Sequence, residues 1–255
     1  MMQRLVLLAL ALLPVAARAQ GDPTLAPPPP PPPGPSGLAE DPNIDRAWFS
    51  PTAATQPKGT VSFNDYELIF LGITYGVTDN FQLTAVVLPP FTDDIPFLGM
   101  ISGKGSLEIA PRVRIAASVA LAFGSVDGDS GTAGVVGGAL SYCTDESCAS
   151  LVSGYVYGGF SLEGEDGAVP VAYGASLVQR LGRRVKLVVD VGSGGVLASE
   201  DAVFAEGILL GYGLRFFTSD IAGDIGFVRP FFLGDNDEDI GFILGLPVVT
   251  FSYRW

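Results

Sequence analysis

The sequence contains no histidine, and charged residues make up only 16% of its 255 positions. The lack of histidine excludes Ser–His catalysis and histidine metal ligands. No GxSxG motif or convincing carboxylate pair takes their place, so we expect no enzyme. Basic residues are also scarce: the chain has 14 Lys and Arg residues and 27 Asp and Glu residues. Without a basic footprint, nucleic-acid binding is not expected.

Long apolar runs are missing as well. After residue 20 no uninterrupted stretch reaches the roughly 18 apolar residues that a membrane-spanning helix needs. Apolar residues nevertheless make up 48% of the chain, together with 33 glycines. This content is too high for a disordered chain. It favours alternating strands, for which a membrane barrel is one setting.

The first 57 residues divide into two parts. Residues 1–19 combine Arg4, an apolar stretch and Ala17-Arg18-Ala19, which predicts a secretory signal peptide. Residues 20–57 form a proline-rich leader with seven consecutive prolines, Pro27–Pro33, which favour an extended polyproline II rod. We interpret this leader as a periplasmic linker; a docking site for a partner is the alternative. Residues 58–255 form the remaining domain.

From residue 58 onward, large apolar side chains recur at every second position. Residues 112–123 show this most clearly, and residues 81–88 and 184–191 repeat it. A strand places such residues on one face, whereas a helix mixes the two classes. The opposite face carries mostly Gly, Ala, Ser and Thr, which suits a lumen, while the apolar face suits lipid.

We therefore predict an all-β fold, an antiparallel transmembrane up-and-down β-barrel of about 12 strands. Three segments, 66–75, 149–160 and 222–232, alternate poorly, so a barrel of about 10 strands remains possible. The expected strands are 58–64, 66–75, 81–88, 97–109, 112–123, 133–142, 149–160, 168–179, 184–191, 203–216, 222–232 and 240–255.

The connections between these strands alternate between two classes. One class is tight, as in residues 76–80 and 180–183, and would form short periplasmic turns. The other is longer and acidic, and would form extracellular loops. The acidic side chains would give one mouth a negative potential. They are Asp93, Asp94, Asp127, Asp129, Glu163, Glu165, Asp166, Asp235, Asp237 and Asp239.

The acidic mouth predicts attraction of cations. Carboxylates there could bind Ca²⁺ or Mg²⁺ weakly, with 235–239 as the best candidate. That stretch lacks the spacing of a helical calcium loop, so we establish no metal site and expect no other cofactor. Cys143 and Cys148 are the two cysteines. In an oxidising compartment they are expected to form a disulfide, with two free thiols as the alternative.

Strand parity also assigns charges to the lumen. A barrel of about 12 strands lies near the boundary between a filled and an open interior. The inward small residues favour an open pore with weak ion selectivity, whereas charges paired across the lumen would plug it. The candidate lumen charges are Lys104, Glu108, Arg112, Arg114, Lys186, Asp190 and Arg254.

The last residues, 249–255, alternate between apolar and polar side chains and end in Trp255. This strand resembles the C-terminal strand of bacterial outer-membrane proteins. Residues 75–81, YGVTDNF, resemble the first periplasmic hairpin of uncharacterised, porin-like outer-membrane β-barrels. The resemblance implies that Phe251, Tyr253 and Trp255 form the signal that the barrel-assembly machinery reads. It also implies a location in the bacterial outer membrane, in contact with its lipid.

The expected function is therefore a passive pore or transporter for small solutes or ions, with a cation-attracting mouth. One alternative is a plugged structural or interaction barrel that displays its acidic loops. A soluble secreted β-barrel is another, although it explains neither the terminal aromatic residue nor the two classes of connection. No feature of the sequence defines the solute or the oligomeric state.

Overall fold

The computed structural model describes residues 40–66, 70–88, 97–126, 129–162, 169–197, 202–204, 207–232 and 245–255. Within these ranges the regular structure consists of β-strands. The predicted signal peptide and the prolines 27–33 lie outside the described residues. The strands are β1 (Val61–Tyr66), β2 (Phe70–Thr78), β3 (Phe81–Leu88), β4 (Phe97–Ala110), β5 (Val113–Val126), β6 (Asp129–Cys143), β7 (Leu151–Ser161), β8 (Val169–Arg180), β9 (Val185–Leu197), β10 (Ala202–Phe204), β11 (Gly207–Phe217), β12 (Ile221–Phe232) and β13 (Leu246–Arg254).

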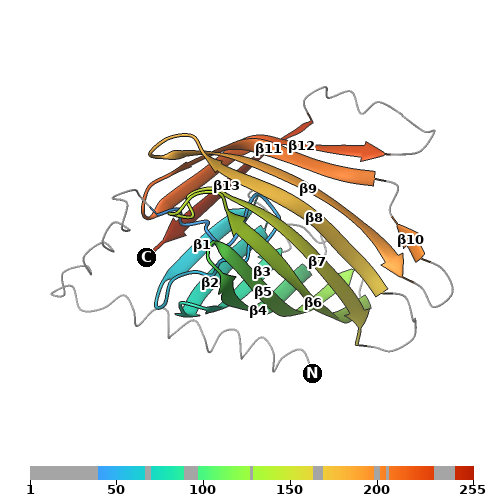
Figure 1. Cartoon of the computed structure of the whole chain (residues 1–255). Helices are drawn as coiled ribbons and strands as arrows, with labels where there is room; N and C mark the ends of the chain where they lie inside the picture. The colour runs from blue at the N-terminus through green and yellow to red at the C-terminus, as the bar shows by residue number, and fades with distance from the viewer. Residues whose placement is uncertain are drawn as a thin grey trace. The chain divides into compact units, whose positions relative to one another are not determined.

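Antiparallel pairing joins these strands into a closed barrel (Figure 1). β1 pairs with both β2 and β13, which closes the sheet. The short β10 pairs with β9 along the edge that β11 also uses, so β10 and β11 occupy one place in the wall. The described strands thus make a closed barrel of twelve. This confirms the predicted count, and the poorly alternating segments are the strands β2, β7 and β12.

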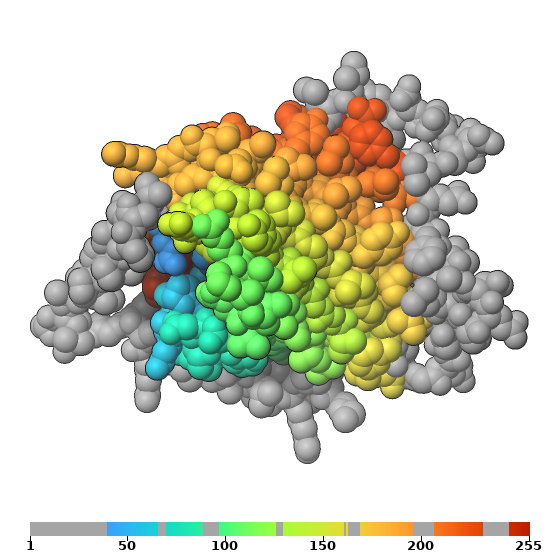
Figure 2. Space-filling model, in the orientation of Figure 1, coloured from blue at the N-terminus to red at the C-terminus, as the bar shows by residue number. Residues whose placement is uncertain are grey.

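The two faces of the wall differ in the predicted way. Ile73, Val119, Val156 and Ile225 point outward and are each more than half exposed. Their neighbours along the strands point inward and are mostly small, polar or charged. The outer surface over β6–β9 is continuous (Figure 2). The apolar side chains therefore cover the outside of the barrel, while its interior is polar.

The connections separate only in part as predicted, because β1–β2 and β5–β6, at the opposite end from the other short hairpins, leave only residues 67–69 and 127–128 between their strands. Asp129, expected in a long acidic loop, is the first residue of β6. The hairpins β2–β3, β4–β5, β6–β7, β8–β9 and β11–β12 are short, and the alternating strand directions place them at one end of the barrel, which we call the tight-turn end. The strands that border the long acidic stretches end together at the opposite, long-loop end. At the tight-turn end, Cys143 and Cys148 form a disulfide with Cα atoms 4.8 Å apart.

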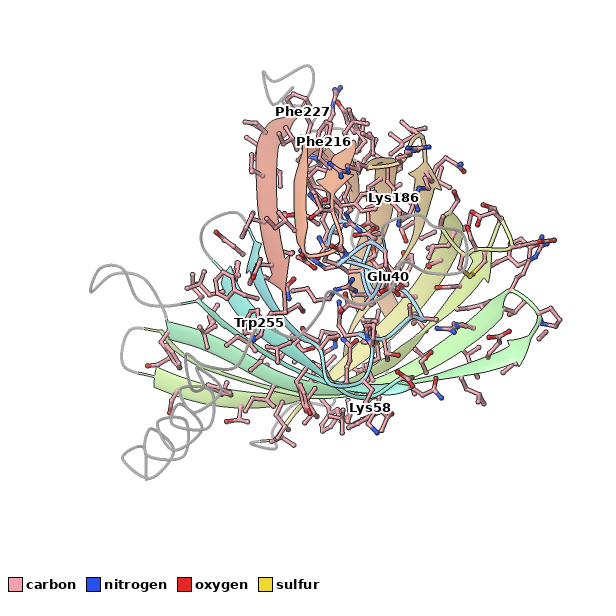
Figure 3. The ribbon with its side chains drawn as sticks, turned by 90° about the vertical axis from the view of Figure 1, so that its left-hand side faces the viewer. Glu40, Lys58, Lys186, Phe216, Phe227 and Trp255 are labelled. Carbon is pink, nitrogen blue, oxygen red and sulfur yellow. A yellow bond between two sulfur atoms is a disulfide. The ribbon has the colours of Figure 1, made fainter. Side chains whose placement is uncertain are left out.

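Residues 40–57, which we call the inner segment, lie inside the ring of strands. They are the part of the predicted leader that the structure describes, and they enter the lumen rather than extend away from the barrel (Figure 3). The segment leads directly into β1, whose Val61 pairs with Trp255 at the tight-turn end. The inner segment therefore occupies that end of the lumen.

The described residues contain no helix with the length and apolar character needed to cross a membrane.

Candidate functional site in the barrel lumen

The inner segment folds on itself before it contacts the wall. The amide of Ala47 donates to the carbonyl of Ser50 over 2.8 Å, and the amide of Thr52 donates to the carbonyl of Asp45 over 3.0 Å. The amide of Asn43 donates to the carboxylate of Asp41 over 2.9 Å. Prolines at 42, 51 and 57 oppose helix formation, so short turns satisfy the backbone.

A buried ion-pair cluster attaches the start of this segment to the wall. The carboxylate of Asp41 lies 2.8 Å from Nζ of Lys186 on β9 and 3.2 Å from Nη1 of Arg215 on β11. Arg215 also pairs with Asp224 on β12 over 2.7 Å. The two positive charges and the two carboxylates of the cluster cancel, so each buried charge has a partner of opposite sign.

The charge state of Asp41 depends on this cluster. Burial alone would raise the pKa of the Asp41 carboxyl group, but the nearby Lys186 ammonium and Arg215 guanidinium outweigh it. They hold the pKa of Asp41 well below its usual range. Asp41 therefore stays ionised at neutral pH.

Asp190 on β9 binds the central turn of the inner segment. One oxygen of its carboxylate accepts the amides of Trp48, Phe49 and Ser50 over 3.1, 3.0 and 2.9 Å. The other oxygen accepts the hydroxyl of Ser50. Successive backbone amides that converge in this way form a nest for an anion. The turn is therefore shaped to fit a carboxylate that the wall supplies.

Trp48 occupies a slot in the wall that two glycines create. The indole is almost completely buried, and it lies against Gly213 on β11 and Gly226 on β12. A Cβ atom would fall 2.6 Å from the ring at Gly213 and 2.5 Å from it at Gly226. A Cβ atom would also fall 2.4 Å from the carbonyl oxygen of Ile225 at Gly213 and 2.2 Å from that of Tyr212 at Gly226, so both the indole and the wall require glycine at these positions.

Further hydrogen bonds reach the opposite side of the lumen. The ammonium of Lys104 on β4 donates to the carbonyls of Asp45 and Thr52 over 3.0 and 3.3 Å. The amide of Ala53 donates to Ser141 on β6 over 2.8 Å. The guanidinium of Arg46 donates to Ser252 on β13 over 2.7 Å. Partners on β4, β6, β9, β11 and β13 show that the segment spans the lumen.

The structure places the predicted lumen charges in two groups. Lys104, Lys186, Asp190 and Arg254 are buried on the inner face, and all four contact residues 40–57 or the turn beside them.

The second group lies near the tight-turn end. Glu108 and Arg114 form a partly exposed pair at 3.7 Å. Arg112 lies in the β4–β5 hairpin with a φ of 68°, and its guanidinium pairs with Glu146 over 3.2 Å. Arg112 is therefore a turn residue that faces away from the network.

Sequence reasoning missed the partners that make the network. The linker interpretation gives Asp41 no partner, and the lumen charges that strand parity predicts include neither Asp224 nor Arg215. A signal for the last pair was present, because Arg215 and Asp224 lie directly opposite each other on adjacent strands. Opposite charges at facing inward positions indicate a cross-strand pair.

The predicted acidic mouth cannot be placed in the same detail. Asp93, Asp94, Asp127, Glu163, Glu165, Asp166, Asp235, Asp237 and Asp239 lie outside the described residues, and Asp129 is described only as the first residue of β6. Among the described residues, no group of three or more Cys, Asp or Glu side chains could hold a metal ion. The Ca²⁺ or Mg²⁺ hypothesis thus remains a prediction.

The final strand has the predicted faces. Phe251, Tyr253 and Trp255 point outward with exposed fractions of 43%, 43% and 57%. The rings of Tyr253 and Trp255 stack with their centres 5.6 Å apart. Thr250, Ser252 and Arg254, which alternate with these aromatic residues, are buried. The surface of this strand is thus aromatic outside and polar inside.

No protein-family model matches the chain, and no curated protein matches it in sequence. Its function is therefore argued from the barrel and its lumen.

Proposed function

We propose that the protein is a bacterial outer-membrane pore whose lumen is closed by its own inner segment. The observation that carries this proposal is the reversed polarity of the barrel. Outward-facing Ile73, Val119, Val156 and Ile225 are exposed, while charged residues such as Arg215 are buried inside. A soluble barrel would bury its apolar face. Lipid on the outside and a polar lumen satisfy both faces.

The contacts of the inner segment support a closed resting state. They extend across the lumen to strands on opposite sides, from Lys104 on β4 to Arg215 on β11. Polar groups form most of these contacts, and water can replace polar contacts when a segment leaves. The Arg215–Asp224 pair lies entirely within the wall and would survive that departure. The lumen would then conduct small solutes or ions.

The acidic stretches would give the pore a preference for cations over anions. The strand ends that border them all lie at the long-loop end, so their carboxylates act at one mouth. A negative mouth raises the local concentration of cations, and salt screens the effect over about 8 Å at physiological ionic strength. We therefore propose a weak preference for cations that fades as salt is raised.

A plugged structural barrel is the second candidate. It is favoured by the depth of the Trp48 slot, where the indole is 2% exposed. Such an anchor, together with the buried Asp41 pairs, could hold the inner segment in place permanently. The barrel would then present its acidic loops at the cell surface without conducting.

The first experiment locates the protein. Cells are fractionated, and the outer-membrane fraction is run on a gel with and without boiling. We expect a band whose migration changes on heating, as folded membrane barrels show. A soluble protein with ordinary migration would overturn the membrane proposal and leave the soluble secreted barrel.

The second experiment separates the pore from the structural barrel. Planar-bilayer conductance is measured for the full chain and for a variant in which residues 40–57 are replaced by a Gly/Ser stretch of equal length. We expect brief openings from the full chain and a stable, cation-preferring current from the variant. If the variant conducts but the inserted full chain never opens, the structural barrel is correct.

A further inference from the structure

Phe49 is an exception within the inner segment. Its neighbours Trp48 and Ser50 are buried, yet its own side chain is 39% exposed. The ring faces a cavity of about 330 Å³ on the lumen side of the wall. None of the contacts that attach the segment to the wall requires an aromatic ring at this position, because its bond to Asp190 uses the backbone.

The lining of this cavity is apolar. Besides Phe49 it comprises aromatic, aliphatic and glycine residues of β7, β9, β11 and β12, with one serine. They are Tyr155, Gly192, Ser193, Gly194, Gly207, Ile208, Leu209, Pro230 and Phe231. The hydroxyl of Ser193 donates to the carbonyl of Gly207 over 2.7 Å. Among the residues that the structure describes, no side chain of the lining carries a charge.

Glycines in this part of the wall leave room for the side chains of Tyr155 and Phe49. A Cβ atom at Gly192 would fall 2.6 Å from the hydroxyl of Tyr155, and one at Gly174 would fall 2.7 Å from it. A Cβ atom at Gly211 would fall 2.9 Å from the ring of Phe49. The recess therefore depends on missing side chains on β8, β9 and β11.

We propose that this cavity binds a neutral, largely apolar small molecule, about the size of one or two fused aromatic rings. Its volume falls at the lower end of the range for ligand pockets, about 300–1,000 Å³. Aromatic walls favour offset or edge-to-face contact with a flat ligand. Because Phe49 belongs to the inner segment, the ligand lies against the element that closes the lumen.

The same lining excludes anionic lipids and fatty acids. An ionised carboxylate buried without a partner loses its hydration, which is costly. The nearest charged side chain on this part of β9, Asp190, is itself an anion and already accepts the amides of the inner segment. Asp190 therefore repels a carboxylate, and the guanidinium of Arg229 on β12 is already engaged over the ring of Phe231, 4.9 Å from its centre.

The test uses two ligands of one shape and different charge. The refolded full chain in lipid nanodiscs is equilibrated with radiolabelled 1-naphthol or 1-naphthoate, and binding to empty nanodiscs is subtracted. We expect saturable binding of one 1-naphthol per barrel. The naphthoate anion should bind at least about tenfold more weakly, a difference of about 1.4 kcal/mol.

Two matched variants on β11 locate the binding. Leu209 lines the cavity and shares the inward face of β11 with Arg215, whereas Leu214 lies on the outer face of the same strand. The two leucines are equally exposed, at 39% and 38%, so they differ in the face they occupy. Leu209→Trp fills the recess and should weaken 1-naphthol binding at least about tenfold, whereas Leu214→Trp should leave it within about twofold. Heat-modifiable migration checks that both variants fold.

Three results would each overturn the proposal: no saturable binding, equal binding of the two ligands, or equal binding by the Leu209→Trp variant. The inference rests on the proposed function only for its lipid setting. A barrel that binds 1-naphthol but never conducts would disprove the pore and leave the site. A conducting barrel without binding would do the reverse.

Discussion

Replacement of Asp41 by Asn tests whether the ion-pair cluster holds the inner segment in place. The amide keeps the shape of the carboxylate but removes its charge, 2.8 Å from Lys186 and 3.2 Å from Arg215. With Asp224 unchanged, the cluster then carries one uncompensated positive charge. Loss of one partner from a buried ion pair costs about 3–5 kcal/mol. The ratio of docked to released segment should therefore fall by roughly 10²–10⁴-fold.

Trypsin cleavage after Arg46 measures this ratio. Arg46 is 7% exposed, and its guanidinium donates to Ser252, so a protease cannot reach it while the segment is docked. Cleavage then requires release, and its rate follows the released population when docking is fast. We expect slow cleavage of the wild-type barrel in nanodiscs and rapid cleavage of the variant, with the cut between Arg46 and Ala47 identified by mass spectrometry.

Two controls distinguish charge from other effects. Adding Lys186→Met to Asp41→Asn removes the unpaired cation and should restore much of the protection. Glu146→Gln breaks the Arg112–Glu146 pair, whose glutamate side chain is 91% exposed, and should change nothing, because surface pairs contribute about 0–1 kcal/mol. Wild-type cleavage rates in the Asp41→Asn variant would refute the reasoning.

Three further predictions follow from the same contacts. Because the pKa of Asp41 is lowered on folding, its stabilisation is complete above about pH 4 and declines as the pH falls further, so single-channel recordings should show more openings in acid. Replacement of Cys143 and Cys148 by Ser should lower the free energy of unfolding by about 2 kcal/mol in urea titrations, since the closed loop is short; an unchanged midpoint would contradict this. Trp48→Ala should empty the slot at Gly213 and Gly226 and speed cleavage at Arg46, and a variant that stays protected would show that the indole does not hold the segment in place.

The wall could be predicted because its information is local. In β5, β9 and β13 large apolar residues recur at every second position, and a strand also has a period of two. Val188 and Val248 are the inward-facing exceptions in β9 and β13. The pattern weakens where glycine replaces side chains on either face, as in β7. It is silent at β10, because three paired residues are too few to show a period.

The contents of the lumen could not be predicted in this way. The inner segment is rich in proline and has no strand period, so its sequence alone indicates a linker. Its partners are distant in the chain: Trp48 and Asp190 are separated by 142 residues, and Arg46 and Ser252 by 206. Such contacts cannot be inferred from a local sequence pattern, because only the closed barrel brings these residues together.

Strand parity placed Lys104, Lys186 and Asp190 on the inner face because each lies well within a strand. Arg112 lies in the hairpin, one residue before β5 begins, and has a φ of 68°. Strand alternation therefore does not apply to it.

The position of the inner segment also constrains the order in which the barrel is built. The segment precedes every strand in the chain, yet its partners include Arg215 on β11 and Ser252 on β13. β13 also makes the pairing with β1 that closes the ring. Contacts over such separations carry a large cost in loop-closure entropy before they form. The segment that is synthesised before every strand therefore acquires its full set of partners only after the last strand has joined the first, so that the earliest residues of this region are the last to be fully bound.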